Sequence, residues 1–134
     1  MRARIEQELA LLRQYYPDVE HSHIAGEDWF RIPRYCFPPG WCIDSEPVST
    51  APIAFKIVAA YPAGEPYGFF TPAKANFNGQ APNNAAPASG VPFGGDWHHF
   101  SWAPDGWSPT NEVRMGSNLL VWVRSFAQRL AEGA

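Results

Sequence analysis

Apolar residues recur at helical spacing in the first sixteen residues. Ile5, Leu9, Leu12 and Tyr16 lie three or four positions apart, with Glu and Arg among the residues between them. This periodicity is typical of an amphipathic helix that packs one face on a core. Tyr16 precedes Pro17, and a residue before proline disfavours the helical conformation. The pattern therefore predicts a helix that ends at Tyr16.

The middle of the chain changes to the alternation of strands. Ile53, Phe55 and Ile57 alternate with their neighbours, which gives one apolar face with a period of two. Similar short runs lie on either side, bounded by Gly, Pro and Asp. Four strands are predicted: two in residues 19–33 joined at Gly26-Glu27-Asp28, a third in 52–62 and a fourth in 67–72.

Residues 73–95 show no sustained period and are rich in Gly, Pro, Asn and Ala. Such a segment predicts a long loop or flap, and a loop of this length is more often functional than incidental. A shorter turn is predicted at Pro38-Pro39-Gly40. Helical spacing returns after the flap. The residues expected on one face of this last helix are Leu119 or Leu120, Val123, Phe126 or Ala127, and Leu130, with Ser117 or Asn118 as N-cap.

These elements predict one α+β domain over residues 1–134. Its order is an N-terminal helix, a four-stranded antiparallel meander, the flap and a C-terminal helix, with the helices packed on one face of the sheet. A length of 134 residues suits a single core, and 46% apolar with 17% charged residues is a folded composition. No internal repeat or linker divides the chain.

The charge pattern argues against two classes of partner. The net charge is −3 and the ten basic residues are dispersed, so neither nucleic acid nor an anionic membrane is an expected partner. The first residues carry charge throughout and resemble no signal peptide, and no run of the sequence is long and apolar enough to span a bilayer. The sequence therefore predicts a cytoplasmic protein with reduced cysteines.

Two short motifs and their order carry a family resemblance. Tyr61-Pro62-Ala63-Gly64-Glu65-Pro66 follows the third predicted strand, and Trp107-Ser108-Pro109 precedes the last helix. With the first helix leading into a meander, they resemble the ubiquitin-conjugating enzyme (UBC-like) superfamily, and in particular its divergent bacterial branch found beside ubiquitin-like proteins and their activating enzymes. That family carries a Tyr-Pro-x-x-Pro-Pro turn; here Pro66 matches its last proline and Glu65 replaces the one before.

The resemblance implies a setting and a pair of partners. It implies a bacterial ubiquitin-like modification pathway, as in antiviral defence, with a ubiquitin-like protein and its activating enzyme as partners. No cofactor is expected, and the oligomeric state stays open. The face that binds an activating enzyme in the family lies on the first helix. There we expect Arg2, Arg4, Glu8 and Arg13 to be exposed, with Arg4 and Glu8 as candidate partner contacts.

The residue that performs the family's chemistry is missing. The family carries its acyl group on a cysteine just before the Trp-Ser-Pro element, but this chain has no cysteine after Cys42. Counting back from Trp107 by the family's spacing leads close to His99, and the family's His-Pro-Asn signature has no clear counterpart. The favoured interpretation is a binding module that handles a ubiquitin-like protein without the usual catalytic cysteine.

Two enzymatic alternatives remain open. In the first, Ser101 or one of the histidines takes the acyl group, with His98 or His99 as the base that a serine nucleophile needs. In the second, which is less favoured, the nucleophile is Cys36 or Cys42. Cysteines beside aromatic residues are usually small buried hydrophobes, and a reactive thiol needs an exposed, electropositive setting.

Two further alternatives carry less weight. His21 and His23 would share one face of a strand, and Asp96, His98 and His99 could add metal ligands, together with the cysteines. No pair among them has a zinc-site spacing, so no metal is expected. The chain could also be a scaffold or immunity-complex subunit unrelated to ubiquitin.

Four large aromatic residues crowd the segment between the flap and the last helix. Trp97, Phe100, Trp102 and Trp107 lie within eleven positions. They are expected to anchor the flap, because a segment with few aliphatic residues needs large side chains to hold it. One or two are expected to stay exposed, which makes Trp97 and Trp102 candidate partner contacts.

Overall fold

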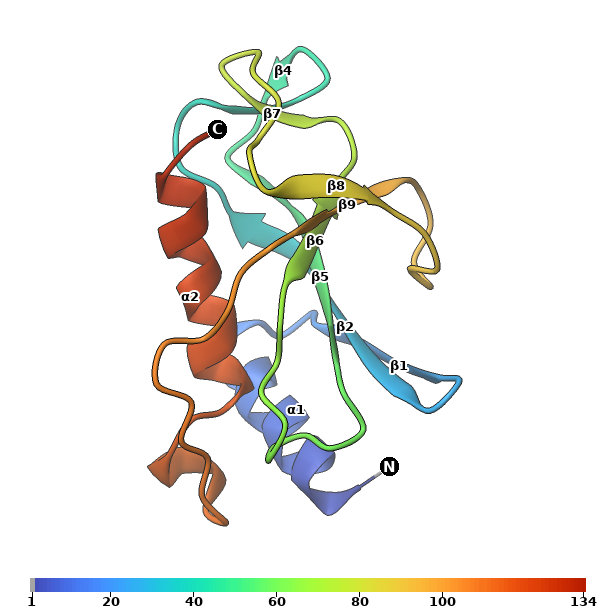
Figure 1. The fold of residues 1–134 in the computed structure, drawn as a ribbon, viewed down its shortest axis with the longest axis vertical. Helices are drawn as coiled ribbons and strands as arrows, with labels where there is room; N and C mark the ends of the chain where they lie inside the picture. Colours follow the sequence, from blue (N-terminus) through green and yellow to red (C-terminus); the bar gives the residue numbers. More distant parts are fainter. Residues whose placement is uncertain (1) are drawn as a thin grey trace.

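The computed structural model describes residues 2–134 (Figure 1). Within this range two α-helices flank a chain of short strands. The helices are α1 (Ala3–Tyr15) and α2 (Leu119–Ala131), with a 3-10 turn, η1 (Val113–Met115). The strands are β1 (Glu20–Ile24), β2 (Glu27–Cys36), β3 (Trp41–Ile43), β4 (Glu46–Pro47), β5 (Thr50–Ile57), β6 (Phe69–Pro72), β7 (Ala75–Phe77), β8 (Ala85–Ala88) and β9 (Trp97–Phe100).

The main sheet is antiparallel throughout and has the order β1-β2-β5-β6-β9-β8. The four strands predicted from the sequence are β1, β2, β5 and β6, which are neighbours in that order. The predicted number is wrong, because β9 pairs with β6 and β8 pairs with β9, which makes six strands. The α+β class, the N-terminal helix and the C-terminal helix are confirmed.

The prediction that residues 73–95 form a long loop or flap without secondary structure is also wrong. Residues 73–95 contain β7, which joins β4 and β3 in a small antiparallel sheet, and β8, which forms the edge of the main sheet. These strands have only three and four residues, so they are too short to show a period. Pro87 in β8 also argued against a strand, but an edge strand tolerates a proline.

A proline also explains an irregularity in the longest strand. The register of β2 against β5 shifts between Ile32 and Tyr35, and Pro33 lies within this interval. Proline has no N–H to donate to the ladder, so a shift of this kind accommodates it. The bulge lets β2 continue to Cys36 and places Tyr35 in the core, where its hydroxyl donates to the carbonyl oxygen of Val123 in α2 at 2.7 Å.

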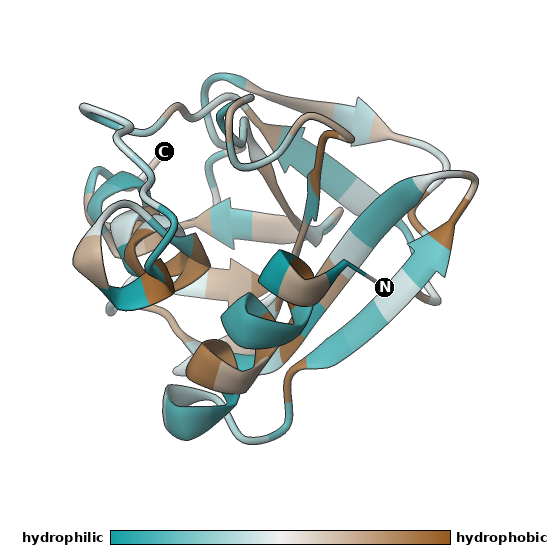
Figure 2. Ribbon diagram, turned by 90° about the horizontal axis from the view of Figure 1, so that it is seen from below, coloured by the Kyte–Doolittle hydropathy of each residue, from teal (hydrophilic) through white to brown (hydrophobic). Residues whose placement is uncertain are grey.

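Both helices pack on the same face of the main sheet (Figures 1 and 2). As predicted, α1 gives way at Tyr16, whose N–H donates to the carbonyl oxygen of Leu12. The N-cap of α2 is Asn118, one of the two expected residues, and its side chain accepts from the N–H of Val121 at 2.9 Å. The core residues they cover on the strands include Phe30, Ile32, Ile53, Phe55, Phe69 and Phe100.

The opposite face of the sheet carries a second, smaller apolar cluster. Trp29, Ala54, Phe70 and Trp97 are buried there, and Phe93 from the β8–β9 connection packs against them. No helix covers this cluster within the described residues. The connection between β8 and β9 therefore covers part of this face, as the helices cover the other.

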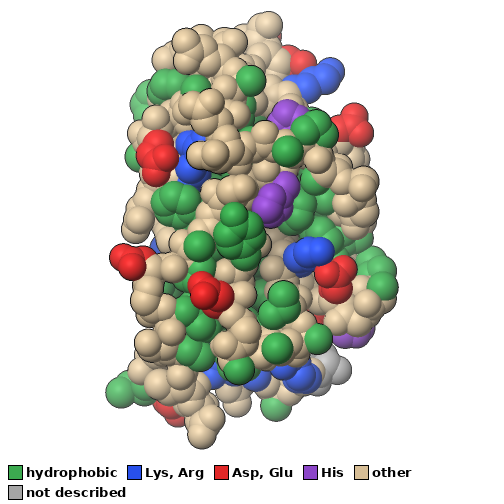
Figure 3. All heavy atoms as spheres, in the orientation of Figure 1, with side chains coloured by type: hydrophobic (Ala, Val, Ile, Leu, Met, Phe, Trp, Pro, Cys, Tyr) green, Lys and Arg blue, Asp and Glu red, His purple; other side chains and the backbone are tan. Residues whose placement is uncertain are grey.

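The surface shown in Figure 3 mixes hydrophobic, basic and acidic side chains, and no continuous basic patch is visible on that face. This agrees with the dispersed charges of the sequence. The two α-helices in the described part of the chain have thirteen residues each. Neither is long and apolar enough to span a membrane.

Candidate functional site

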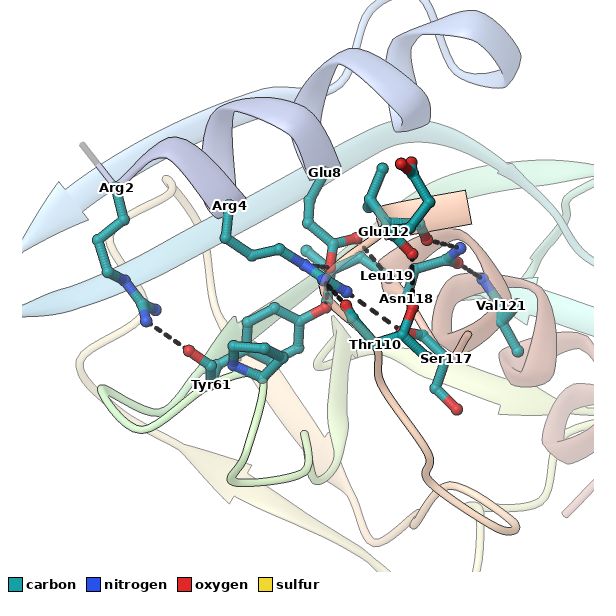
Figure 4. Close-up of polar contacts among 12 residues, drawn as sticks. Arg2, Arg4, Glu8, Tyr61, Thr110, Glu112, Ser117, Asn118, Leu119 and Val121 are labelled. Carbon is teal, nitrogen blue, oxygen red and sulfur yellow. Dashed lines mark hydrogen bonds and ion pairs between the residues drawn. The ribbon is translucent and has the colours of Figure 1, made fainter. Parts of the chain in front are cut away.

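A buried carboxylate on α1 joins three distant parts of the chain (Figure 4). Glu8 is 0% exposed. One of its oxygens accepts hydrogen bonds from the Tyr61 hydroxyl and, at 2.9 Å, from Nε of Arg4, and the other accepts from the N–H of Leu119 at 2.8 Å. A buried charge is tolerated when it is paired and hydrogen-bonded in this way.

The sequence-based expectation of an exposed Glu8 is therefore wrong. Position 8 lies three residues after Ile5 and four before Leu12, so it belongs to the apolar face of the helix. This spacing was the signal that could have identified it. A charged residue is assigned to solvent by default, because a sequence does not show which distant donors meet it.

Arg2 and Arg4, at the start of α1, both donate to backbone carbonyl oxygens, whereas Arg13 is exposed as expected. The Arg4 side chain is only 13% exposed, and besides Glu8 it donates to the carbonyl oxygens of Thr110 and, at 3.3 Å, Ser117. Arg2 donates to the carbonyl oxygen of Tyr61. The first helix is thus connected both to the Tyr-Pro turn and to the segment between Trp107 and α2.

The two motifs that carry the family resemblance contact each other. Nε1 of Trp107 donates to the carbonyl oxygen of Pro62 at 2.8 Å, and the rings of Tyr61 and Trp107 lie 5.8 Å apart. Burial, with the neighbouring Glu8 as second cause, raises the pKa of Tyr61 far above its usual range. The Tyr61 hydroxyl therefore stays protonated and keeps donating to Glu8.

A hollow of about 440 Å³ opens where these parts meet. We call the surface around it the convergent face, because α1, the Tyr-Pro turn and the segment after Trp107 each supply part of its wall. The polar network beneath fixes all three parts in place, so the surface is formed before any partner arrives. The hollow is lined by Arg4, Gln7, Pro62, Ala63, Pro109, Thr110 and Asn111.

The histidines that follow Trp97 point to opposite faces of the sheet. They occupy adjacent positions of β9, and successive side chains of a strand alternate. His99 lies on the face of Phe70, with the two rings 5.0 Å apart, and an added Cβ on Gly68 would approach its Nε2 to 2.0 Å. Burial, followed by the charge of Lys56, lowers the pKa of His99. His98 shares the other face with Phe100.

Ser101 is not brought to either histidine by any hydrogen bond found among residues 2–134. It follows the end of β9, is exposed, and its N–H donates to the carbonyl oxygen of Asn84 at 2.9 Å. A serine nucleophile needs a base within hydrogen-bonding reach. The geometry therefore gives no support to Ser101 as an activated nucleophile.

His98 instead shares a cavity with a cysteine. His98 and Cys42 both line an open cavity of about 590 Å³ between β9 and the small sheet, together with Asp44 and Lys74. Both cysteines of the chain are free thiols; Cys36 is exposed and Cys42 is half-buried. The structure therefore groups one of the less favoured nucleophiles with one of the expected bases, which their separation in sequence did not indicate.

The histidines of β1 converge on a carboxylate of β2. Asp28 is buried, and one of its oxygens lies 2.8 Å from Nε2 of His21 and 3.0 Å from Nδ1 of His23. No group of three or more His, Cys, Asp or Glu side chains in the described range is arranged to hold a metal ion. His21 and His23 are therefore hydrogen-bonding partners of Asp28, a role the sequence reasoning missed.

The aromatic residues of this region mainly anchor the chain, as predicted. Trp97 is 5% exposed and packs in the outer cluster, so it offers little surface to a partner. Trp102 and Trp107 are half-buried, and Nε1 of Trp102 donates to the Ser125 hydroxyl at 3.1 Å. Among the tryptophans expected as partner contacts, Trp102 keeps an accessible side.

Comparisons with known protein families, with characterised proteins and with solved structures give no match for this chain.

Proposed function

We propose that this protein is a UBC-like binding module of a bacterial ubiquitin-like modification pathway, without the conventional catalytic cysteine. Its partner in this proposal is a ubiquitin-like protein or the activating enzyme of that protein. The observation that carries the proposal is the convergent face. The three features that resemble the family, far apart in the sequence, are joined by hydrogen bonds around Glu8 and by the bond from Trp107 to Pro62.

The segment around His99, where the family carries its cysteine, favours a binding role over a catalytic one. His98 and His99 point to opposite faces there, and Ser101 makes no hydrogen bond to either within residues 2–134. A rigid surface without an assembled nucleophile and base suits recognition better than acyl transfer.

The direct test is calorimetric titration of the protein with the ubiquitin-like protein and with the activating enzyme encoded beside its gene. Ala63 and Asn111 both line the hollow of the convergent face and are exposed. Replacing both by arginine blocks the surface without touching the core, and it should weaken binding at least about tenfold. Ala86→Arg on the exposed part of β8 is the matched control and should leave the affinity unchanged.

Absence of binding to both proteins at micromolar concentrations would contradict the proposal. Equal loss of affinity in Ala86→Arg and in the double variant would move the interface away from the convergent face.

A second candidate function rests on the shared cavity of His98 and Cys42. In this alternative the Cys42 sulfur attacks the carbonyl carbon of a thioester held by the activating enzyme, and the bond from that carbon to the enzyme's sulfur breaks. His98 accepts the proton from Cys42 and passes it to the leaving thiolate. The product is an acyl thioester on Cys42.

Intact-mass measurement after incubation with ATP, the ubiquitin-like protein and the activating enzyme separates the two candidates. An adduct that is lost on mild thiol treatment and absent in Cys42→Ser supports transfer through Cys42. An adduct that resists thiol but is lost to hydroxide indicates Ser101 instead. No adduct, with the activating enzyme charged in the same tube, supports the binding module.

A further inference from the structure

Strand β1 forms an open edge of the main sheet. Among the described residues it pairs only with β2, which continues the sheet on its other side through β5. In Figure 1, β1 is the outermost strand of the sheet, and no other described segment pairs with its outer side. Backbone groups that face outward from an edge strand are free to pair with a further strand.

The hairpin turn determines which residues of β1 face outward. The two residues between β1 and β2 both have positive φ, 53° and 79°, which is typical of a two-residue type I′ turn. In such a hairpin the flanking residues, Ile24 and Glu27, form a hydrogen-bonded pair, and bonded and non-bonded pairs alternate along the ladder. The backbone groups of Ser22 therefore point to β2, whereas those of His21 and His23 point outward.

This edge lacks the features that usually keep other strands away. At the opposite edge of the sheet, β8 contains Pro87. The sequence of β1 is Glu-His-Ser-His-Ile, without proline, glycine or lysine, and its register against β2 is regular. Prolines, lysines and bulges are the devices by which edge strands avoid pairing with other chains. Of the two edges, β1 is therefore the one open to a further strand.

The side chains beside this edge are already held by the hairpin itself. One oxygen of Asp28 lies 2.8 Å from Nε2 of His21 and 3.0 Å from Nδ1 of His23. The carboxylate of Glu20 accepts from Arg31 at 2.9 Å, which offsets its charge. Because these contacts order the side chains in advance, less conformational entropy is lost when a second strand binds.

We propose that β1 pairs antiparallel with β1 of a second copy of this chain, about a two-fold axis at Ser22, so that the two main sheets become one. This register pairs all five residues of the strand. His21 of each copy lies opposite His23 of the other, and each of these pairs exchanges both of its backbone hydrogen bonds.

The sequence of β1 is complementary to itself in this register. Ser22 lies opposite Ser22 of the second copy, and Glu20 lies opposite Ile24, so no two acidic or two basic residues face each other. Ile24 is 48% exposed in the single chain and gains a neighbour. One two-fold contact pairs the open β1 edge of both copies at once, which favours a second copy over an unrelated strand.

Disulfide cross-linking tests the register. Opposed residues of a non-hydrogen-bonded pair have Cα atoms about 4.5 Å apart, which a disulfide can span. Ser22→Cys, in a chain whose Cys36 and Cys42 are replaced by serine, should therefore give a disulfide-linked dimer on mild oxidation. The matched control is Ile24→Cys. Ile24 is more exposed than Ser22, but in this register it lies at least about 13 Å from Ile24 of the second copy, so this variant should stay unlinked.

Sedimentation equilibrium of the protein alone measures the dimer, and the wild type should associate between about 10 μM and 1 mM. Ser22→Lys places two ammonium groups opposite each other at the two-fold axis, and it should raise the dissociation constant at least about tenfold. Ile24→Lys adds the same charge opposite Glu20 of the second copy. It should leave the dissociation constant unchanged or lower it.

Three outcomes would overturn the proposal. One is a wild-type protein that stays monomeric at about 1 mM. Another is a contact elsewhere, seen as equally fast cross-linking of Ile24→Cys and Ser22→Cys or as a dimer that Ser22→Lys does not weaken. The third is a monomer whose binding to the ubiquitin-like protein is lost in Ser22→Lys, which would assign the edge to a strand of that partner. Because cross-linking and sedimentation use this protein alone, their failure does not bear on binding at the convergent face.

Discussion

The convergent face and strand β9 bring polar residues together in opposite ways. At the convergent face, Glu8 and Leu119 are 111 positions apart and are joined by a hydrogen bond. On β9, His98 and His99 are adjacent in sequence and point to opposite faces of the sheet. Proximity along the chain therefore indicates little about a shared site when the residues lie on a strand, whereas a helix face and two turns can form one surface from three distant segments.

The two regions also differ in what holds them. A charged network with partners from three elements fixes the convergent face. Strand β9 is held by backbone pairing with β6 and β8. This pairing does not depend on the side chains of β9, which only have to pack on the two faces of the sheet. Substitutions should therefore have large effects in the first region and small effects at the exposed positions of the second.

The largest effect is expected from Glu8→Ala. The change removes the carboxylate, leaves the Tyr61 hydroxyl and the N–H of Leu119 without their partner and deprives Arg4 of its counter-charge, so the free energy of unfolding should fall by about 3–5 kcal/mol. Urea unfolding measures it. The control is Glu6→Ala on the same helix, which alters an exposed carboxylate and should stay within about 0.5 kcal/mol of the wild type. A loss below about 1 kcal/mol for Glu8→Ala would contradict the central role of this residue.

Asp28 offers a sharper form of the comparison, because it is a buried carboxylate whose partners belong to the same hairpin. Asp28→Asn should cost about 1–3 kcal/mol at neutral pH, less than the loss at Glu8, since a hydrogen bond to a charged group is weakened rather than a whole network dismantled. Denaturant unfolding of both proteins across the acidic range measures it.

The cost at Asp28 should depend on pH. Burial raises the pKa of Asp28, but the hydrogen bonds from His23 and His21 outweigh it, and the pKa lies below its ordinary value. The stability contribution of Asp28 is therefore complete above the unfolded-state pKa of about 3.9 and is lost as the pH falls through the lower folded-state pKa. A difference between wild type and Asp28→Asn that grows on acidification would contradict this direction.

A single neutral hydrogen bond should give an intermediate effect. Trp107→Phe keeps an aromatic ring beside Tyr61 but loses the bond to Pro62, and we expect a loss of about 1 kcal/mol, together with weaker partner binding at the convergent face. Trp97→Phe is the comparison on β9, where the indole N–H donates to Phe93 within its own loop at a longer 3.3 Å. The midpoint temperature of thermal unfolding should be lower for Trp107→Phe than for Trp97→Phe. The reverse order would contradict the inference that the hydrogen bond of Trp107 is the stronger of the two.

The smallest effect is expected at Ser101. The residue is exposed, and Ser101→Ala should change the free energy of unfolding by less than about 0.5 kcal/mol. It should also leave unchanged, in calorimetry, any affinity for the ubiquitin-like partner that we propose. A variant that folds normally but loses an acyl adduct formed by the wild type would instead establish the serine as a nucleophile.

Regular periodicity identified the elements that are long enough to show it. The limits of α1, the N-cap of α2 and the alternation of β5 follow from the apolar positions of the sequence. The short strands β3, β4, β7, β8 and β9 were not predicted, because runs of two to four residues are too short to show a period. They are strands because neighbouring strands supply the partners for their backbone groups.

The residues of the candidate site divide in the same way into those that the sequence indicated and those that only the structure showed. The sequence alone showed the Tyr-Pro turn at Tyr61, the Trp-Ser-Pro element at Trp107 and the lack of a cysteine after Cys42. It did not indicate that the first helix and both turns share one buried carboxylate, or that Trp122 keeps an unpaired N–H. Residue types, local periods and turns are properties of neighbouring positions, so the sequence determined them. Partners for buried polar groups come from distant segments, and only the tertiary structure decided which of them meet.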